Sequence, residues 1–154
     1  MSIRFKKILF LKLSKIFLTF LIIVVFTISE NLKAENITGS KTYDTDTNNT
    51  QYIFTEDNSS AVVTGNTTLE RSRKLFILND SERTGNTLTI HFGSTVSTTT
   101  NSNTIFTDGA DLTIVNSGTI NSDSSKAINV SNSDGVSITN NSTGVIKSNN
   151  NTIL

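Results

Sequence analysis

The sequence of 154 residues contains no cysteine, no proline and no tryptophan, and it has a single histidine, His91. Without cysteine, the chain can form no disulfide, offers no thiol nucleophile and cannot be anchored as a lipoprotein. A zinc site rich in histidine or cysteine is excluded for the same reason. An exported chain of this composition must therefore fold on hydrogen bonds and side-chain packing alone.

The charges balance over the whole chain but are unevenly distributed along it. Lysine plus arginine and aspartate plus glutamate each total 13. Six of the basic residues and only one acidic residue, Glu30, lie within residues 1–34, which leaves 7 basic and 12 acidic residues in positions 35–154. Nucleic-acid binding requires clustered lysine and arginine to displace counterions from phosphates. The acidic remainder argues against a nucleic-acid partner.

The first 34 residues have the order of a secretory signal peptide. Residues 1–15 carry five positive charges, Ile16–Ile28 is apolar apart from two threonines, and the segment ends at Leu32-Lys33-Ala34. The apolar run of 13 residues is shorter than the roughly 20 needed to span a bilayer as a helix. We therefore expect a helical signal peptide over residues 1–34, cleaved after Ala34, and an uncleaved anchor is the alternative.

The remaining 120 residues contain 23 threonines, 18 asparagines and 17 serines. An apolar-hydroxyl-apolar triplet recurs within this polar background at intervals of 24 residues, and two further apolar positions per repeat recur at similar spacing. A repeat at a fixed period indicates a solenoid. The sequences that carry it are Leu88-Thr89-Ile90, Leu112-Thr113-Ile114 and Val136-Ser137-Ile138.

Each repeat contains three short strands separated by turn-forming residues, such as Asp108-Gly109 and Asp134-Gly135. If each repeat makes one turn about 4.8 Å above the last, the apolar side chains stack inward and the polar ones stack outward. The sequence thus predicts an all-β parallel β-helix with about 24 residues per turn. Disordered low-complexity chain and an antiparallel β-sandwich are the alternatives.

Three regions follow from this pattern. Residues 1–34 are the signal peptide, residues 35–60 a polar leader or N-terminal cap region, and residues 61–154 the turns of the β-helix. Nothing near Leu154 is typical of a cap, and Ile153 and Leu154 would leave apolar strand edges unpaired. We therefore expect that the chain is the N-terminal part of a longer β-helix, or that a partner covers its end.

The leader and two segments of the repeat resemble the start of an autotransporter passenger domain. The segments are Leu112 to Ile120 and Val136 to Ile146. Each begins with the pattern apolar-x-apolar-x-Asn, which is followed by Gly-x-Ile or a close variant of it. The resemblance implies a right-handed parallel β-helix, passage through the export machinery of the inner membrane, and the surface of a Gram-negative bacterium. It also implies an outer-membrane β-barrel in a full-length relative, which these 154 residues do not contain.

Two short motifs could carry a ligand. Asp44-Thr45-Asp46-Thr47-Asn48 begins like a calcium loop, but its sixth position is Asn49 and its twelfth is Thr55, where glycine and glutamate are required. We interpret it as a solvated polar segment. Glu70-Arg71-Ser72-Arg73-Lys74 is the basic cluster of the mature chain, and we interpret it as the solvated flank of a strand.

Few residues could act as catalysts. His91 lies at the end of a predicted strand, and no sequence order typical of a catalytic triad accompanies it, so we expect a surface or groove histidine. Aspartates on neighbouring turns could form an acid-base pair of the kind found in β-helix polysaccharide lyases and hydrolases. Their places at predicted corners favour turn formation instead; they are Asp108, Asp111, Asp123 and Asp134.

These observations predict an exported, structural or adhesin-like β-helix with no catalytic, cofactor-binding or metal-binding residue. Its partners would be surface glycans or the surfaces of host or neighbouring cells. A fragment of a β-helix carbohydrate-active enzyme whose site lies beyond residue 154 is the competing class. A truncated remnant without function is the third possibility.

Overall fold

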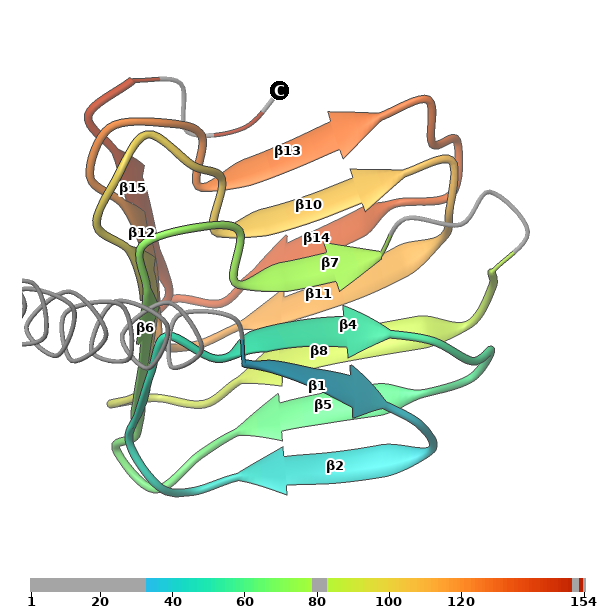
Figure 1. Ribbon diagram of the computed structural model, residues 1–154, viewed down its shortest axis with the longest axis horizontal. Helices are drawn as coiled ribbons and strands as arrows, with labels where there is room; N and C mark the ends of the chain where they lie inside the picture. Colours follow the sequence, from blue (N-terminus) through green and yellow to red (C-terminus); the bar gives the residue numbers. More distant parts are fainter. Residues whose placement is uncertain (1–32, 79–82, 151–152, 154) are drawn as a thin grey trace, which may run out of the picture. The chain divides into compact units, whose positions relative to one another are not determined.

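The computed structural model describes residues 33–78, 83–150 and 153, and these form an all-β parallel β-solenoid (Figure 1). The expected signal peptide lies outside the described residues except for Lys33 and Ala34, and Ala34 is the first residue of β1. The strands form three parallel sheets of five strands each. Every third strand along the chain joins the same sheet, so each turn of the solenoid contributes one strand to each sheet.

The three sheets are named here A, B and C. Sheet A contains β1 (Ala34–Ile37), β4 (Gln51–Phe54), β7 (Phe76–Leu78), β10 (Ile105–Asp108) and β13 (Ile128–Ser131). Sheet B contains β2 (Ser40–Tyr43), β5 (Ser60–Val63), β8 (Asn86–Ile90), β11 (Leu112–Asn116) and β14 (Ser137–Asn140). Sheet C contains β3 (Thr47–Asn48), β6 (Thr68–Arg71), β9 (Thr95–Thr98), β12 (Thr119–Ser122) and β15 (Val145–Ser148).

The predicted repeat length is confirmed in the C-terminal turns, where Ile114 pairs with Ile138 and Thr95 with Thr119. Residues so paired are 24 positions apart, as are Asn116 and Asn140, whose side chains are joined by a hydrogen bond. Alternation along each strand sends one side chain inward and the next outward. Three short strands per turn therefore enclose a narrow core, as the repeat predicts.

The register between β8 and β11 differs from the one predicted from the triplets. Leu88 pairs with Ile114, and Leu112 pairs with Asn86, so Leu88 and Leu112 do not share a vertical row. The cause is a difference in the length of the corner that follows each strand. Residues 91–94 separate β8 from β9, whereas only Ser117 and Gly118 separate β11 from β12. The longer corner shifts the pairing of β8 with β11 by two residues relative to that of β9 with β12. Leu88 and Leu112 are nevertheless both buried.

Buried aliphatic side chains fill most of the interior, and an aromatic column occupies the N-terminal turns. Tyr43 and Tyr52 have ring centroids 4.6 Å apart, and Tyr52 stacks on Phe76 at 5.1 Å. Contacts of this kind add to the stabilisation that burial provides. The aliphatic core residues with no exposed surface are Ile37, Ala61, Val63, Leu69, Leu75, Leu78, Leu88, Ile90, Val96, Ile105, Ile114, Ile120, Ala127 and Ile128.

Polar side chains also point inward, which the sequence did not indicate. At the end of sheet C, Thr98 and Ser122 occupy one inward row, and the Thr98 hydroxyl contacts those of Ser122 and Thr104 at 3.3 and 2.9 Å. The asparagine pair Asn116 and Asn140 was expected among outward ladders but lies at an inward row of sheet B, which places Asn116 in register with Ile90. Asn116 is buried and its amide nitrogen is satisfied by this hydrogen bond, whereas Asn140 in the C-terminal turn is exposed.

Corners form where the sequence predicted them. Gly109 has a φ of +73° at the corner between β10 and β11, a conformation that glycine adopts without strain. The Asp134-Gly135 pair lies between β13 and β14. The repeat also begins earlier in the chain than its sequence pattern indicates: residues 35–60, expected as a leader or cap region, contain β2 and β3 and nearly all of β1, and then β4 of the second turn.

The C-terminal turn is less covered than the turns below it. β13, β14 and β15 are the edge strands of the three sheets, and Ile153 makes an isolated parallel bridge to Ile128. Ile138 and Ile146 are only partly buried, although their counterparts one turn below, Ile114 and Ile120, are fully buried. This end of the described chain therefore presents apolar side chains beside unpaired strand edges.

Candidate functional site

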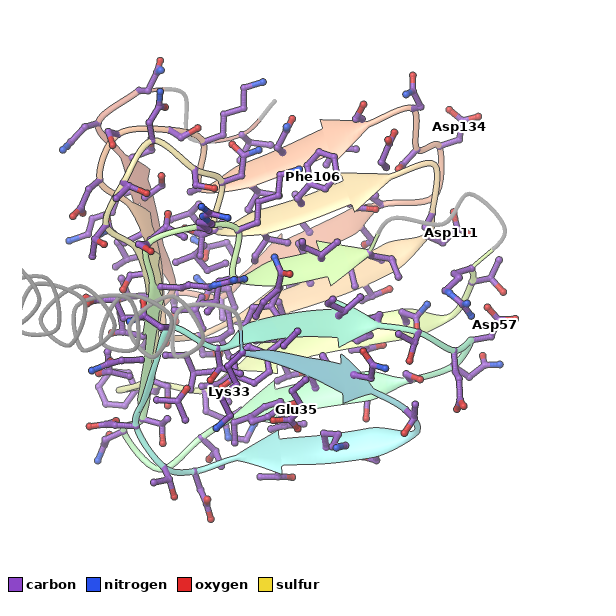
Figure 2. The ribbon with its side chains drawn as sticks, in the orientation of Figure 1. Lys33, Glu35, Asp57, Phe106, Asp111 and Asp134 are labelled. Atoms are coloured by element: carbon purple, nitrogen blue, oxygen red, sulfur yellow. The ribbon has the colours of Figure 1, made fainter. Side chains whose placement is uncertain are left out.

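Three of the four candidate aspartates lie at the corner between sheets A and B, which is the right-hand side of Figure 2. The Asp108 carboxylate accepts a hydrogen bond from the Asn132 amide one turn above, at 3.0 Å. Asp111 lies against the backbone of Gly135, where a side chain would come within 1.9 Å of its Oδ1. Asp134 is exposed beside this glycine. Asp108 and Asp111 thus lie at one corner of a single turn, and Asp134 lies at the corresponding corner of the next turn.

Asp123 does not join that group. It follows β12 at the corner between sheets C and A, where its Oδ1 accepts a hydrogen bond from the Asn121 amide at 2.8 Å. Its backbone N–H donates to the Thr98 carbonyl. The four aspartates proposed from the sequence are therefore divided between two corners, and the hydrogen bonds of Asp108 and Asp123 go to neighbouring asparagine side chains.

His91 is exposed at the corner that follows β8. Its Nδ1 lies 3.1 Å from the Thr64 hydroxyl of the turn below, and its backbone N–H donates to the Val63 carbonyl. Among the residues that the structure describes, no carboxylate forms a hydrogen bond with the ring. The arrangement is that of a surface histidine and lacks the oriented carboxylate that a triad requires.

The motif that begins like a calcium loop forms the corner between β2 and β3. The Asp46 carboxylate accepts a hydrogen bond from the backbone N–H of Thr68 at 2.6 Å, and Asp44 accepts one from the Thr45 hydroxyl at 3.3 Å. Asn49, at the sixth position, has a φ of +63°. Within residues 33–78, 83–150 and 153, no group of three or more histidine, cysteine, aspartate or glutamate side chains is arranged to hold a metal ion.

The basic cluster at residues 70–74 corrects one expectation. Arg71 is not part of a solvated flank: it lies in the inward row of β6 and is only 5% exposed. Its Nη1 donates to the Lys74 carbonyl at 2.9 Å, where the chain bends toward β7. Burial, and then the charge of Arg73, lower the pKa of Arg71. Arg73 itself is exposed, as the sequence indicated.

Lys74 belongs to a surface feature that the sequence did not reveal. Its Nζ lies 3.4 Å from the centroid of the Phe106 ring, a cation–π contact on the outer face of sheet A. Ile53, Ile77 and Phe106 are in register on β4, β7 and β10 and are all partly exposed. They form one vertical apolar column between polar rows.

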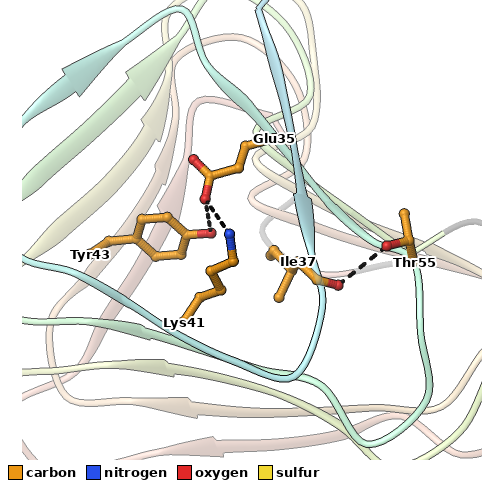
Figure 3. Close-up of polar contacts among 5 residues, drawn as sticks. All are labelled: Glu35, Ile37, Lys41, Tyr43 and Thr55. Atoms are coloured by element: carbon orange, nitrogen blue, oxygen red, sulfur yellow. Dashed lines mark hydrogen bonds and ion pairs between the residues drawn. The ribbon is translucent and has the colours of Figure 1, made fainter.

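A charged group also occupies the interior of the first turn (Figure 3). Glu35 is in register with Tyr52, and Lys41 is in register with Ala61, so both occupy inward rows that are apolar in the turns above. The Glu35 carboxylate contacts Lys41 Nζ and accepts a hydrogen bond from the Tyr43 hydroxyl, each at 3.2 Å. Burial and the neighbouring Glu35 charge raise the pKa of Tyr43.

This ion pair covers the N-terminal end of the core with groups that interact well with water. Its two side chains are 38% and 36% exposed, so the charges remain partly hydrated. The sequence contains a signal for this inward ion pair, because Glu35 alternates with Ile37, and Lys41 with Tyr43, in two short segments. The structure thus supplies the atypical first turn that a solenoid requires.

Comparisons of the chain with protein-family models, curated proteins and solved structures find no match. The class of the protein is therefore defined by its own architecture, which is that of a parallel β-solenoid with a charged first turn. Among the described residues, no helix is both long and apolar enough to span a bilayer.

Proposed function

We propose that the protein is an exported β-solenoid that works as a structural or adhesive module on the surface of a Gram-negative cell. The leader at residues 1–34 supports export, and the resemblance of the repeat to autotransporter passengers supports a surface location. The proposed partners are glycans or the surfaces of neighbouring cells. In this function the outer faces of the sheets make the contacts, and no residue performs catalysis.

The observation that carries this proposal is how the candidate catalytic side chains are hydrogen-bonded. Asp108 and Asp123 accept hydrogen bonds from asparagine side chains at corners, and among the described residues no carboxylate forms a hydrogen bond with the His91 ring. An acid-base mechanism requires a titratable pair directed at one substrate position. The outer rows, by contrast, are long, regular and rich in serine and threonine, which suits a spacer or an adhesive surface.

A β-helix carbohydrate-active enzyme is the second candidate. Asp108, Asp111 and Asp134 favour it, because all three lie at the corners between sheets A and B, the first two in one turn and Asp134 in the next. Figure 2 labels Asp111 and Asp134 on this side of the molecule. Glycosidases place two carboxyl groups about 5–10 Å apart. In a protein of this class, replacing Asp111 with Asn would abolish cleavage of a polysaccharide, whereas the structural proposal predicts no cleavage by either form.

The proposal is tested by producing the chain in a Gram-negative host and treating intact cells with a protease that cannot enter them. We expect the protein to be cleaved on intact cells and to bind a subset of an immobilised glycan panel. A protein that stays in the cytoplasm would contradict export. Protein that is protected until the outer membrane is opened would contradict the surface location. Release of reducing sugar ends from polysaccharides would favour the enzyme.

A further inference from the structure

The outer face of sheet B consists entirely of serine, threonine and valine. Two outward rows run along the five strands, and each row contains one residue from every strand. We call this face the hydroxyl grid. One row contains Ser40, Ser60, Thr87, Thr113 and Ser137, and the other contains Thr42, Val62, Thr89, Val115 and Thr139.

The hydroxyl groups of the grid are largely unused by the protein. Ser40 and Ser60 share a hydrogen bond of 2.9 Å. The other six hydroxyl side chains of the grid make no hydrogen bond within the part of the chain that the structure describes. All ten residues are at least partly exposed. The grid therefore presents a regular array of free hydroxyl and methyl groups to water.

The other two outer faces differ from the grid in charge. The outer row of sheet C contains Glu70 and Lys147, and the outer face of sheet A contains Asp108 with the Lys74 side chain over Phe106. The grid contains no charged and no aromatic residue. Protein partners are usually anchored by tryptophan, tyrosine or arginine. The grid offers none of these anchors.

The spacing of the grid is regular in two directions. Parallel strands lie about 4.8 Å apart, and alternate residues on one strand lie roughly 6.6 Å apart. The distance between strands is close to the shorter repeat of water oxygens on planes of crystalline ice, and the distance along a strand is somewhat shorter than the longer repeat. Methyl groups on such an array order the water around them, and neighbouring hydroxyls hold that water in place. A charged side chain would instead impose its own hydration shell.

From this match we infer that the hydroxyl grid binds ice, its ligand being a plane of the crystal that the ordered surface water joins. The inference is independent of the proposed surface location, because it rests only on the outer face of sheet B. Thr87-Leu88-Thr89 supplies two threonines on one strand, and Thr113-Ile114-Val115 supplies a threonine and a valine on the next. β8 and β11 each have a paired strand on both sides, and with five residues each they are the longest strands of sheet B.

The test measures how much protein enters a slowly growing ice crystal, using the full chain in the form that cells accumulate. Thr89→Lys and Thr113→Lys place a charge at the centre of the grid. Thr119→Lys is the matched control, because Thr119 points outward from sheet C between Thr95 and Val145. Circular dichroism and melting temperature confirm that each variant is folded before it is compared.

We expect the unsubstituted protein and Thr119→Lys to be incorporated into ice, and both grid variants to be excluded with the other solutes. Exclusion of the unsubstituted protein would overturn the inference. Equal loss in Thr119→Lys would overturn it as well, because the effect would then not belong to sheet B. A dimer in solution that Thr113→Lys dissociates would show instead that this face binds a second copy.

Discussion

Individual inward residues contribute to the contacts that hold successive turns together. Asn116 is fully buried, and its amide donates hydrogen bonds to the Asn140 side chain at 2.8 Å and to the Val145 carbonyl at 3.2 Å. Ile90 occupies the equivalent position one turn below. A polar side chain is tolerated here because its hydrogen bonds join β11 to the turn above and to the start of β15.

Replacing Asn116 with Ala should lower the free energy of unfolding by about 1–3 kcal/mol, because the two hydrogen bonds that the buried Asn116 amide makes to the next turn are lost. Asn149→Ala is the control, since this asparagine is exposed and its side chain makes no hydrogen bond in the described structure. It should change stability by less than about 0.5 kcal/mol. Urea unfolding followed by circular dichroism measures both, and equal effects would contradict a buried role for Asn116.

Two glycines with ordinary backbone conformations differ in what surrounds them. A Cβ atom at Gly118 would lie 2.4 Å from the Ser94 carbonyl oxygen and 2.5 Å from that of His91. A Cβ atom at Gly135 would instead meet the Asp111 carboxylate. Backbone atoms at a packed corner cannot move aside, whereas a partly exposed carboxylate can rotate.

We therefore predict that Gly118→Ala destabilises the protein by about 1–3 kcal/mol, the usual range for an inserted carbon that forces a backbone shift. Gly135→Ala should cost less than about 1 kcal/mol, as surface substitutions generally do. Thermal melting of the two variants beside the parent chain distinguishes them. A larger loss for Gly135→Ala than for Gly118→Ala would show that the corners pack differently.

At the scale of the element, the first turn differs chemically from the turns above it. Glu35 and Lys41 occupy inward positions that hold Tyr52 and Ala61 in the next turn. The aromatic column begins directly above them with Tyr43 and Tyr52. Burial is the largest cause that raises the pKa of each tyrosine, and the Glu35 charge raises both further.

The tyrosines give this turn a predictable response to alkaline pH. Because their pKa values are raised in the folded state, the folded chain holds these protons more tightly than the unfolded chain does. Stability from this source is fully present below about pH 10, the pKa of a free tyrosine, and is lost as the pH rises above it. The midpoint of urea unfolding should therefore be lower when it is measured above that pH than when it is measured below it.

Substitution separates the tyrosines from the other groups of the first turn. The Glu35 carboxylate contacts both Lys41 Nζ and the Tyr43 hydroxyl. Tyr43→Phe removes one titrating hydroxyl and keeps the ring, so the decline of stability above about pH 10 should become shallower. Thr42→Val, on the outward side of the same strand, is the control. An unchanged pH profile in Tyr43→Phe would contradict the assigned role of its hydroxyl.

At the scale of the whole molecule, the repeat in the sequence was sufficient to predict the parallel β-solenoid and its three strands per turn. The prediction succeeded because Ile114 and Ile138, or Thr95 and Thr119, are separated by the same number of residues. It failed for Leu88 and Leu112, because the corner after β8 is longer than the corner after β11.

Surface features depend on the same registers and were therefore harder to foresee. Lys74 and Phe106 meet only because β7 and β10 are adjacent in sheet A. Arg71 was expected in solvent because its neighbours are charged, yet its place in the inward row of β6 buries it. Likewise, the polar composition predicted outward rows of polar side chains. Which residues share a row of the hydroxyl grid could be established only from the observed strand pairing.

Cross-linking of the turns tests the central claim, which is that successive repeats are stacked in the observed register. Because the chain has no cysteine, two can be introduced without side reactions. Thr87 pairs with Thr113 across β8 and β11, and both point outward. Thr89 with Thr113 is the control pair, which is the one that a uniform repeat of 24 residues would align.

Paired residues on parallel strands lie about 4.8 Å apart, whereas the control pair is offset along the strands to roughly 8 Å. A disulfide requires Cα atoms about 4.4–6.8 Å apart. Under mild oxidation, mass spectrometry of the double variant Thr87→Cys/Thr113→Cys should show an intramolecular disulfide, and Thr89→Cys/Thr113→Cys should remain reduced. A disulfide in the second variant and none in the first would contradict the register, and none in either would contradict the stacked turns.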